Sequence, residues 1–133
     1  MTDSAAKRDD VSSDLLMALL AVNSWTLERV CGLYESLRKN GLFDVSILSG
    51  LTPEQIQGRL SAAGYERGPV LGRMIASRVQ NLAVALFEGG DQLLVDCEAS
   101  RDISATRAYL LQLHGVGLTV VENYLLLRSS AAS

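Results

Sequence analysis

Apolar residues recur along the chain at intervals of three and four, the spacing that places side chains on one face of a helix. One such face is made by Leu27, Val30, Leu33 and Leu37. No stretch alternates between apolar and polar residues as a half-buried strand would. The pattern predicts helices over residues 13–22, 26–39, 52–63, 70–87, 104–113 and 118–128, with a shorter helical piece over 91–97. We therefore expect a compact all-α barrel or bundle of about six helices.

Short polar residues, proline and glycine mark where these helices begin and end. The candidate N-caps are Ser13 or Asp14, Thr26, Thr52 and Ser104. Thr52 is followed by Pro53 and Gln55, so it can form a capping box with proline at the first helical position. The predicted C-terminal ends of helices lie at glycines, namely at Asn40-Gly41, Gly64 and Gly89-Gly90. Residues 44–50 are expected to be a short turn or helix between two of these elements.

The two ends of the chain are polar and small. Residues 1–12 (MTDSAAKRDDVS) are expected to form a disordered tail, and residues 130–133 a second one. One helical domain, over residues 13–129, lies between them. The apolar run over 15–22 is too short for a membrane helix, so we expect no membrane contact. We expect a cytoplasmic protein with reduced thiols.

Residues 110–117 (LLQLHGVG) join the last two helices through a Gly-Val-Gly turn, which predicts a helix–hairpin–helix motif at about 104–128. Gly115 and Gly117 accept backbone angles that side chains forbid, and they let a ligand approach the main chain. The first-turn amides and dipole of the helix from Leu118 suit a phosphate, while Val116 can anchor the turn in the core. The alternative is an ordinary helix corner in which both glycines serve geometry alone.

The hairpin segment resembles a known family. Residues 113–117 (LHGVG) are similar to the Leu-Pro-Gly-Val-Gly hairpin of the helix–hairpin–helix DNA glycosylases, the endonuclease III superfamily. Residues 15–25 (LLMALLAVNSW) resemble that family's apolar helix and its Gln-Asn-Thr-Ser-Trp-like turn. Residues 62–65 (AAGY) resemble its Gly-Phe/Leu-Tyr element. The resemblance covers about residues 14–128 and implies the six-helix barrel lobe of the family fold, with a phosphate-binding hairpin.

The resemblance also implies which residues contact DNA. In the hairpin region they are His114, Gly115, Val116, Gly117 and Thr119. Arg107, on the preceding helix, is added as a DNA-binding candidate because of its positive charge. Asn23 and Ser24 correspond to the region that enters the base stack in the family. We expect the partner to be double-stranded DNA, bound through its phosphates.

The catalytic groups of the family have no counterpart in this sequence. Family glycosylases use an aspartate well after the hairpin, and bifunctional members add a lysine two positions after its last glycine. Thr119 occupies the lysine position, no lysine follows Lys39, and the sequence ends before the expected aspartate. Glu122 is the one carboxylate of the last helix, and we interpret it as a solvent-facing residue rather than a base. We therefore expect no catalytic residue.

Composition narrows the chemistry further. One histidine and two distant cysteines, Cys31 and Cys97, cannot form a zinc site or an iron–sulfur cluster alone, so we expect no metal and no cofactor. The chain has a net charge of −3, which disfavours strong binding to a polyanion. Residues 57–90 carry a net charge of +2 and residues 103–133 a net charge of +1, so a weakly basic face is possible. DNA binding would then be weak and salt-sensitive.

Three functional hypotheses follow from the sequence. The leading one is a non-catalytic, endonuclease III-like module that binds duplex phosphates through its hairpin. The second is one half of a split base-excision glycosylase, completed by a partner chain that brings the second lobe. The third is a protein-interaction or dimerisation module, including a homodimer, suggested by the acidic composition and the apolar last helix over 120–127.

Overall fold

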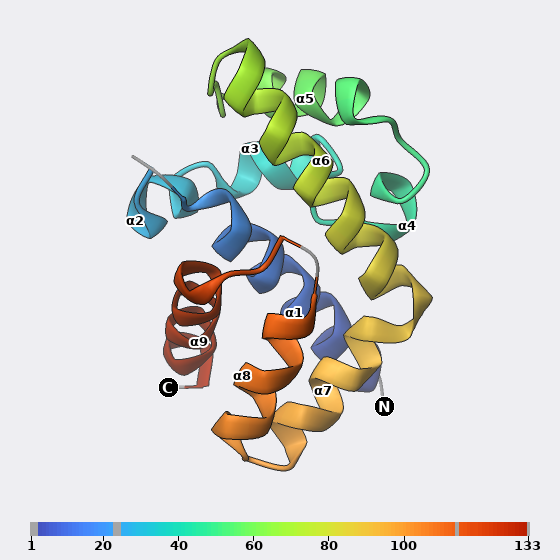
Figure 1. Ribbon diagram of the computed structural model, residues 1–133, viewed down its shortest axis with the longest axis vertical. Helices are drawn as coiled ribbons and strands as arrows, with labels where there is room; N and C mark the ends of the chain where they lie inside the picture. Colours follow the sequence, from blue (N-terminus) through green and yellow to red (C-terminus); the bar gives the residue numbers. More distant parts are fainter. Residues whose placement is uncertain (1–2, 23–24, 114, 133) are drawn as a thin grey trace.

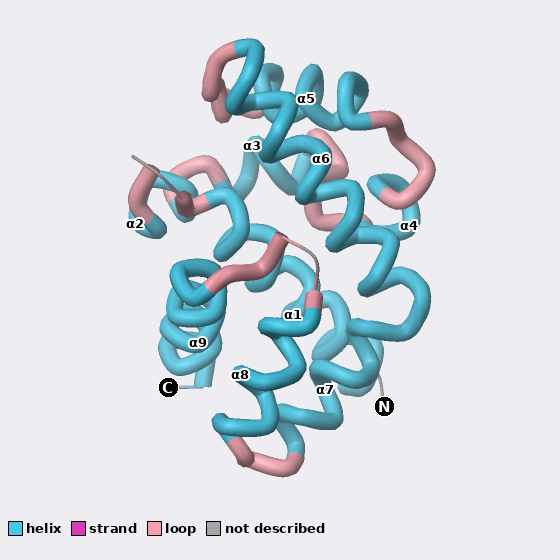
Figure 2. Tube along the Cα trace, in the orientation of Figure 1, coloured by secondary structure: helices cyan, strands magenta, loops and turns pink. Residues whose placement is uncertain are grey.

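The computed structural model describes the backbone of residues 3–22, 25–113 and 115–132, and the side chains of residues 11–22, 25–113 and 115–129. Every regular element in these residues is helical, which confirms the all-α prediction (Figures 1 and 2). The elements are α1 (Asp3–Leu20), α2 (Leu27–Cys31), α3 (Tyr34–Lys39), α4 (Val45–Leu48), α5 (Pro53–Ala62), α6 (Pro69–Ala85), the π-helical turn η1 (Leu86–Gly90), α7 (Asp91–Ala99), α8 (Ile103–Gln112) and α9 (Leu118–Ala132).

Helix α1 forms the centre of the fold. Its residues 15–20 and the following Ala21 are all buried, so this helix is apolar on every side over two turns. It packs against α2, α6, α7 and α9, which surround it in Figure 1. Helices α5 and α6 pack against each other and contribute Ile56, Leu60 and Val79 to the same core.

The start and stop signals of the middle helices are confirmed. Thr26 and Thr52 cap α2 and α5 with their side chains. The Thr52 amide donates to Gln55 Oε1 over 3.0 Å, and the Gln55 amide donates to Thr52 Oγ1 over 3.2 Å, which completes the capping box. Gly41 and Gly64 have φ angles of 74° and 98°, the left-handed conformation expected after a helix.

Both ends of the chain differ from the prediction. The first helix starts at Asp3 rather than at Ser13 or Asp14, so residues 3–12 are helical where a disordered tail was expected. Val11 and Ser12 are buried, and Val11 belongs to the core, which gives this extension tertiary support. Helix α9 likewise continues to Ala132, past the predicted end at 128 and into the second expected tail.

Three internal boundaries also differ. The predicted helix over 26–39 is divided into α2 and α3, with Gly32 and Leu33 between them. Asp102, not Ser104, caps α8, because its Oδ1 accepts from the Ala105 amide over 3.1 Å. Gly89 was expected to end a helix, but α7 follows η1 without a loop. Gly89 has a φ of 117°, which kinks the chain between α6 and α7.

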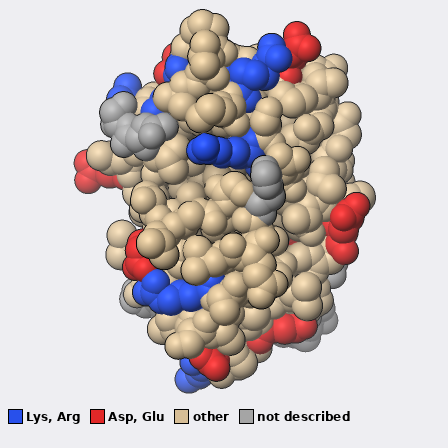
Figure 3. Space-filling view, in the orientation of Figure 1, with Lys and Arg blue, Asp and Glu red and all other residues tan. Residues whose placement is uncertain are grey.

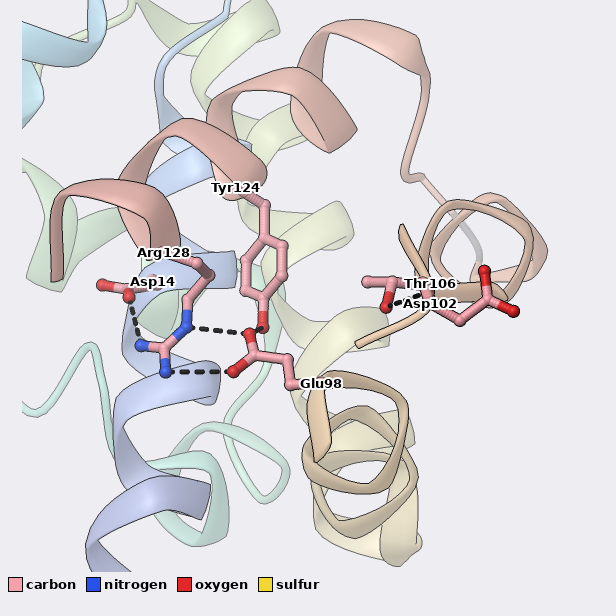
Figure 4. Close-up of polar contacts among 6 residues, drawn as sticks. All are labelled: Asp14, Glu98, Asp102, Thr106, Tyr124 and Arg128. Atoms are coloured by element: carbon pink, nitrogen blue, oxygen red, sulfur yellow. Dashed lines mark hydrogen bonds and ion pairs between the residues drawn. The ribbon is translucent and has the colours of Figure 1, made fainter. Parts of the chain in front are cut away.

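A partly buried polar cluster joins three helices at one end of the molecule (Figure 4). The Arg128 guanidinium of α9 donates to Glu98 of α7 over 2.8 and 3.1 Å and to Asp14 of α1 over 2.7 Å. The Tyr124 hydroxyl donates to Glu98 Oε2 over 2.5 Å. The cluster fixes α9 against α1 and α7, and so sets the direction in which the α8–α9 turn is presented.

Candidate functional site

The turn between α8 and α9 combines a left-handed glycine with a buried anchor. Gly115 has a φ of 84°, a conformation that favours glycine over other residues. The Val116 amide donates to Leu113 O over 3.2 Å, and the Val116 side chain is buried in the core. The predicted anchoring role of Val116 is therefore confirmed, and it holds the main chain of the turn in a defined place.

Helix α9 begins without a side-chain cap from its N-cap residue. The Val121 amide donates to Gly117 O over 3.0 Å, which places Gly117 at the N-cap. Threonine or aspartate fills this position in α2, α4, α5 and α8, and its side-chain oxygen accepts a hydrogen bond from a first-turn amide. No atom lies within 4 Å of the position that a Gly117 Cβ would occupy. The positive end of the α9 dipole is thus left open on this side.

A hollow of about 570 Å³ lies beside this helix start. It is lined by Val22, Arg78 and the turn residues Gly115, Val116, Gly117, Leu118, Thr119 and Val120. The hollow brings together four of the six residues predicted around the hairpin, namely Gly115, Val116, Gly117 and Thr119. It is large enough to receive a phosphate group together with bound water.

Arg78 of α6 is the cation that this hollow contains. A Cβ on Gly115 would lie 3.3 Å from Arg78 Cγ, so the absence of a side chain at Gly115 lets the arginine stem pack on the turn. No carboxylate among the described residues forms an ion pair with Arg78. Sequence reasoning missed this residue, and the only signal for it was the net charge of +2 over residues 57–90.

Arg107 is placed differently from the sequence expectation. Its guanidinium forms an ion pair with Glu122 of α9, and it does not line the hollow. The hydrogen bond from Arg107 lowers the pKa of the Glu122 carboxyl, which therefore stays charged and paired. The three remaining candidates, His114, Asn23 and Ser24, lie outside the described residues.

Two more arginines contact Val22 or Trp25, which follow α1. Arg67 Nη1 donates to Val22 O over 3.2 Å and to the Tyr65 hydroxyl over 2.8 Å. The guanidinium carbon of Arg29 lies 3.8 Å from the centre of the Trp25 ring, a cation–π contact. Figure 3 shows basic groups on the face of the molecule that carries α6 and the α8–α9 turn. Basic groups thus lie on this face, among acidic ones, although the whole chain has a net charge of −3.

Three side chains donate hydrogen bonds to backbone carbonyls at the C-terminal end of α1 and hold this end next to the turn. Asn123 Nδ2 donates to Ala21 O over 2.9 Å, and the Tyr65 hydroxyl donates to Leu20 O over 2.5 Å. Together with Arg67, these groups satisfy carbonyls that a helix end leaves without partners. The arrangement explains why Val22, far from the turn in sequence, forms a wall of the hollow.

The part of the chain that the structure describes contains no group of three or more His, Cys, Asp or Glu residues that could hold a metal ion. In the same residues, no helix combines the length and the apolar character that crossing a bilayer requires. Comparisons of the chain with protein-family models, with curated proteins and with solved structures give no significant match.

Proposed function

We propose that this chain is a non-catalytic module that binds the phosphates of duplex DNA through the Gly115–Thr119 turn. The observation that carries the proposal is the hollow in which the start of α9 meets Arg78, which has no ion-pair partner among the described side chains. Backbone amides at a helix start and one guanidinium are the groups that proteins use to hold a phosphate. The resemblance of residues 113–117 to the endonuclease III-like hairpin supports the same conclusion.

The electrostatics of the site set the kind of binding. A phosphate in the hollow would meet partial positive charge from α9 and a full charge from Arg78, and the described residues that line the hollow offer no other charged side chain to read a base edge. The interaction is therefore independent of DNA sequence. With few cations involved and a chain charge of −3, the binding is weak and salt weakens it further.

The chemistry near the turn favours binding over catalysis. The residue two positions after Gly117 is Thr119, which cannot form a Schiff base as a lysine amine would. The one carboxylate of α9 close to the turn is Glu122, and Arg107 holds it in an ion pair. A charged, paired carboxylate on an exposed helix face is not positioned to assist the loss of a base.

The direct test measures duplex binding as a function of salt for the unmodified chain and for Gly117→Leu. The space around Gly117 is open and its φ is not left-handed, so leucine fits without strain but occupies the hollow. We expect the Kd to rise about tenfold or more at low salt, the equivalent of a lost charge-assisted contact. Gly58→Leu, at an equally open position on α5, is the matched control. Equal affinity of the two variants, or no binding at low salt, would refute the proposal.

A further inference from the structure

A second hollow, of about 750 Å³, lies where α3, α4, α5 and η1 approach one another. It shares no lining residue with the hollow beside the α8–α9 turn. Helices α3 and α5 lie in the upper part of Figure 1, whereas α8 and α9 lie in its lower part. The volume is within the range of pockets that bind small molecules. The lining combines aromatic rings with basic side chains, and we call it the α3–α5 hollow.

Tyr34 and Phe43 supply the aromatic part of the α3–α5 hollow. Their ring centres lie 5.1 Å apart and their planes are inclined by 28°, so the two rings stack on each other. Both rings line the hollow, and Tyr34 is 38% exposed. A stacked pair with an exposed ring can receive one more flat ring, which is how aromatic side chains bind nucleobases.

Arg59 of α5 supplies a cation that is already held in place. Its Nη1 donates to Asn40 O over 2.9 Å. A Cβ on Gly41 would lie 3.0 Å from the same nitrogen, so the glycine lets the guanidinium lie against the main chain of this turn. In the described part of the chain, no carboxylate forms an ion pair with Arg59 or with Lys39, the exposed lysine of the lining. A fixed guanidinium with a lysine in the same lining suits a phosphate group.

Two carboxylates also line the hollow, and each lies at the start of a helix. Asp44 caps α4 with its side chain, and Asp91 Oδ1 accepts from the amide of the next residue over 2.7 Å. Amides and the positive end of a helix dipole offset a negative charge at such positions. The third cation of the lining, Arg38, is paired with Glu35 over 2.8 Å. With this balance of charges, the hollow suits a ligand that carries one phosphate rather than a polyanion.

We propose that the α3–α5 hollow binds one nucleotide unit, with the base on the Tyr34 ring and the phosphate at Arg59 and Lys39. Tyr34 and Lys39 are the first and last residues of α3, about 7.5 Å apart along the helix axis. The aromatic and basic parts are thus separate but close, as the base and the phosphate of a nucleotide are. A free nucleotide and an unpaired nucleotide of a single strand both present this chemistry. The inference concerns residues other than those of the α8–α9 turn, so it does not rest on duplex binding there.

Calorimetric titration of the full chain tests the proposal. The probes are the four common nucleoside monophosphates, one at a time, with their nucleosides and inorganic phosphate for comparison. We expect at least one monophosphate to bind at least about tenfold more tightly than its nucleoside or inorganic phosphate, because it alone uses both parts of the hollow. A single-stranded oligonucleotide of the same base identifies the source: tighter binding than the monophosphate indicates a strand, and weaker binding indicates a free nucleotide. No binding of any monophosphate, or equally tight binding of inorganic phosphate, would overturn the proposal.

Substitutions separate the two parts of the hollow. Arg59→Gln should raise the Kd of the monophosphate at least about tenfold and leave that of the nucleoside nearly as it is, whereas Tyr34→Leu should raise both about fivefold or more. Lys39→Gln, at an exposed position, should weaken monophosphate binding too, and it serves if circular dichroism shows that Arg59→Gln is unfolded. Tyr34→Phe keeps the ring, and Arg73→Gln removes an arginine outside the lining, so both should bind as the unmodified chain does. Equal losses in Arg59→Gln and Arg73→Gln, or in Tyr34→Leu and Tyr34→Phe, would show that the hollow is not the site.

Discussion

Arg78 and Arg107 carry the same charge, and their surroundings give them different roles. Arg107 is neutralised by Glu122, whereas Arg78 packs its stem on Gly115 and directs its charge to the hollow without a carboxylate partner among the described side chains. A cation that already holds a carboxylate must give it up to bind a phosphate. Arg78, which has no carboxylate partner among the described side chains, loses no ion pair on binding a phosphate and bears only the cost of its own desolvation. Phosphate binding should therefore depend on Arg78 more than on Arg107.

Arg78→Gln tests whether the hollow, rather than net charge, determines binding. We expect duplex affinity at low salt to fall and the slope of log K against log salt to decrease by about 1, as one phosphate contact is lost. Arg38→Gln removes the same charge from α3, where Arg38 is exposed and paired with Glu35, and serves as the control. Salt titrations of duplex binding measure both. If the two variants lose affinity equally, net charge rather than the hollow determines binding.

The Tyr124 hydroxyl makes the free energy of unfolding depend on pH in the alkaline range. Burial raises its pKa above the ordinary 10.0, and the hydrogen bond to Glu98 raises it further. Its contribution to the free energy of unfolding is present below pH 10, where the hydroxyl is protonated in both states. It is lost above pH 10, because the unfolded chain ionises first. We expect Tyr124→Phe to lower stability by about 1–2 kcal/mol at neutral pH and to flatten the alkaline decline.

Denaturant unfolding between pH 7 and pH 11 checks the Tyr124 prediction. Part of the alkaline decline should remain, since burial also raises the pKa of Tyr65 and Tyr109. Tyr34→Phe, which removes the hydroxyl of an exposed ring, is the control. An unchanged slope in Tyr124→Phe would show that this hydroxyl has no part in the alkaline loss of stability.

At the scale of the elements, α9 lacks a stabilising side-chain cap, and its start is therefore open. The side chains of Asp44, Thr52 and Asp102 each accept a hydrogen bond from a first-turn amide. Gly117 has no side chain with which to do so. Gly117→Asp would add both a cap and a negative charge at the positive end of the dipole. We expect it to raise the free energy of unfolding by about 0.5 kcal/mol while it reduces duplex binding.

The opposite signs of these two effects make Gly117→Asp informative. Thermal unfolding gives the change in stability, and a salt titration of duplex binding gives the change in affinity. Gly117→Ser offers the cap without the charge, so it should stabilise α9 and reduce binding less than aspartate does. A variant with both higher stability and unchanged binding would mean that the α9 amides do not contact DNA.

The elements also show what sequence patterns can and cannot predict here. Caps such as Thr52 and stops such as Gly64 depend on residues within one helical turn, so local rules place them correctly. The extension of α1 to Asp3 depends on the burial of Val11 in a core built from distant segments, which no local rule contains. The hairpin glycines were found from their spacing, but Arg78 reaches them only through the packing of α6 on the turn. Arg107 was assigned from its charge, and its partner Glu122 became evident only once α8 and α9 were side by side.

At the scale of the whole molecule, the cluster around Arg128 holds the first and last helices together. Its guanidinium joins Asp14 of α1 to Glu98 of α7, and all three side chains are about one-fifth to one-quarter exposed. Groups of this kind add little when intact, relative to apolar side chains of the same size. Removing one member is costly because it leaves the opposite charge buried without compensation. The cluster therefore determines which way α9 faces more than how stable the fold is in total.

Arg128→Met should consequently lower the free energy of unfolding by about 3 kcal/mol, since two partly buried carboxylates lose their cation. Adding Glu98→Gln should recover part of that loss, because the neutral amide can still accept from Tyr124 and no longer repels Asp14. Denaturant unfolding of the single and double variants gives the coupling free energy. The exposed Arg38→Gln is again the control, and it should change stability by less than about 0.5 kcal/mol. Additive losses in the double variant would mean that Arg128 and Glu98 act independently, and that the orientation of α9 and of its hairpin rests on apolar packing alone.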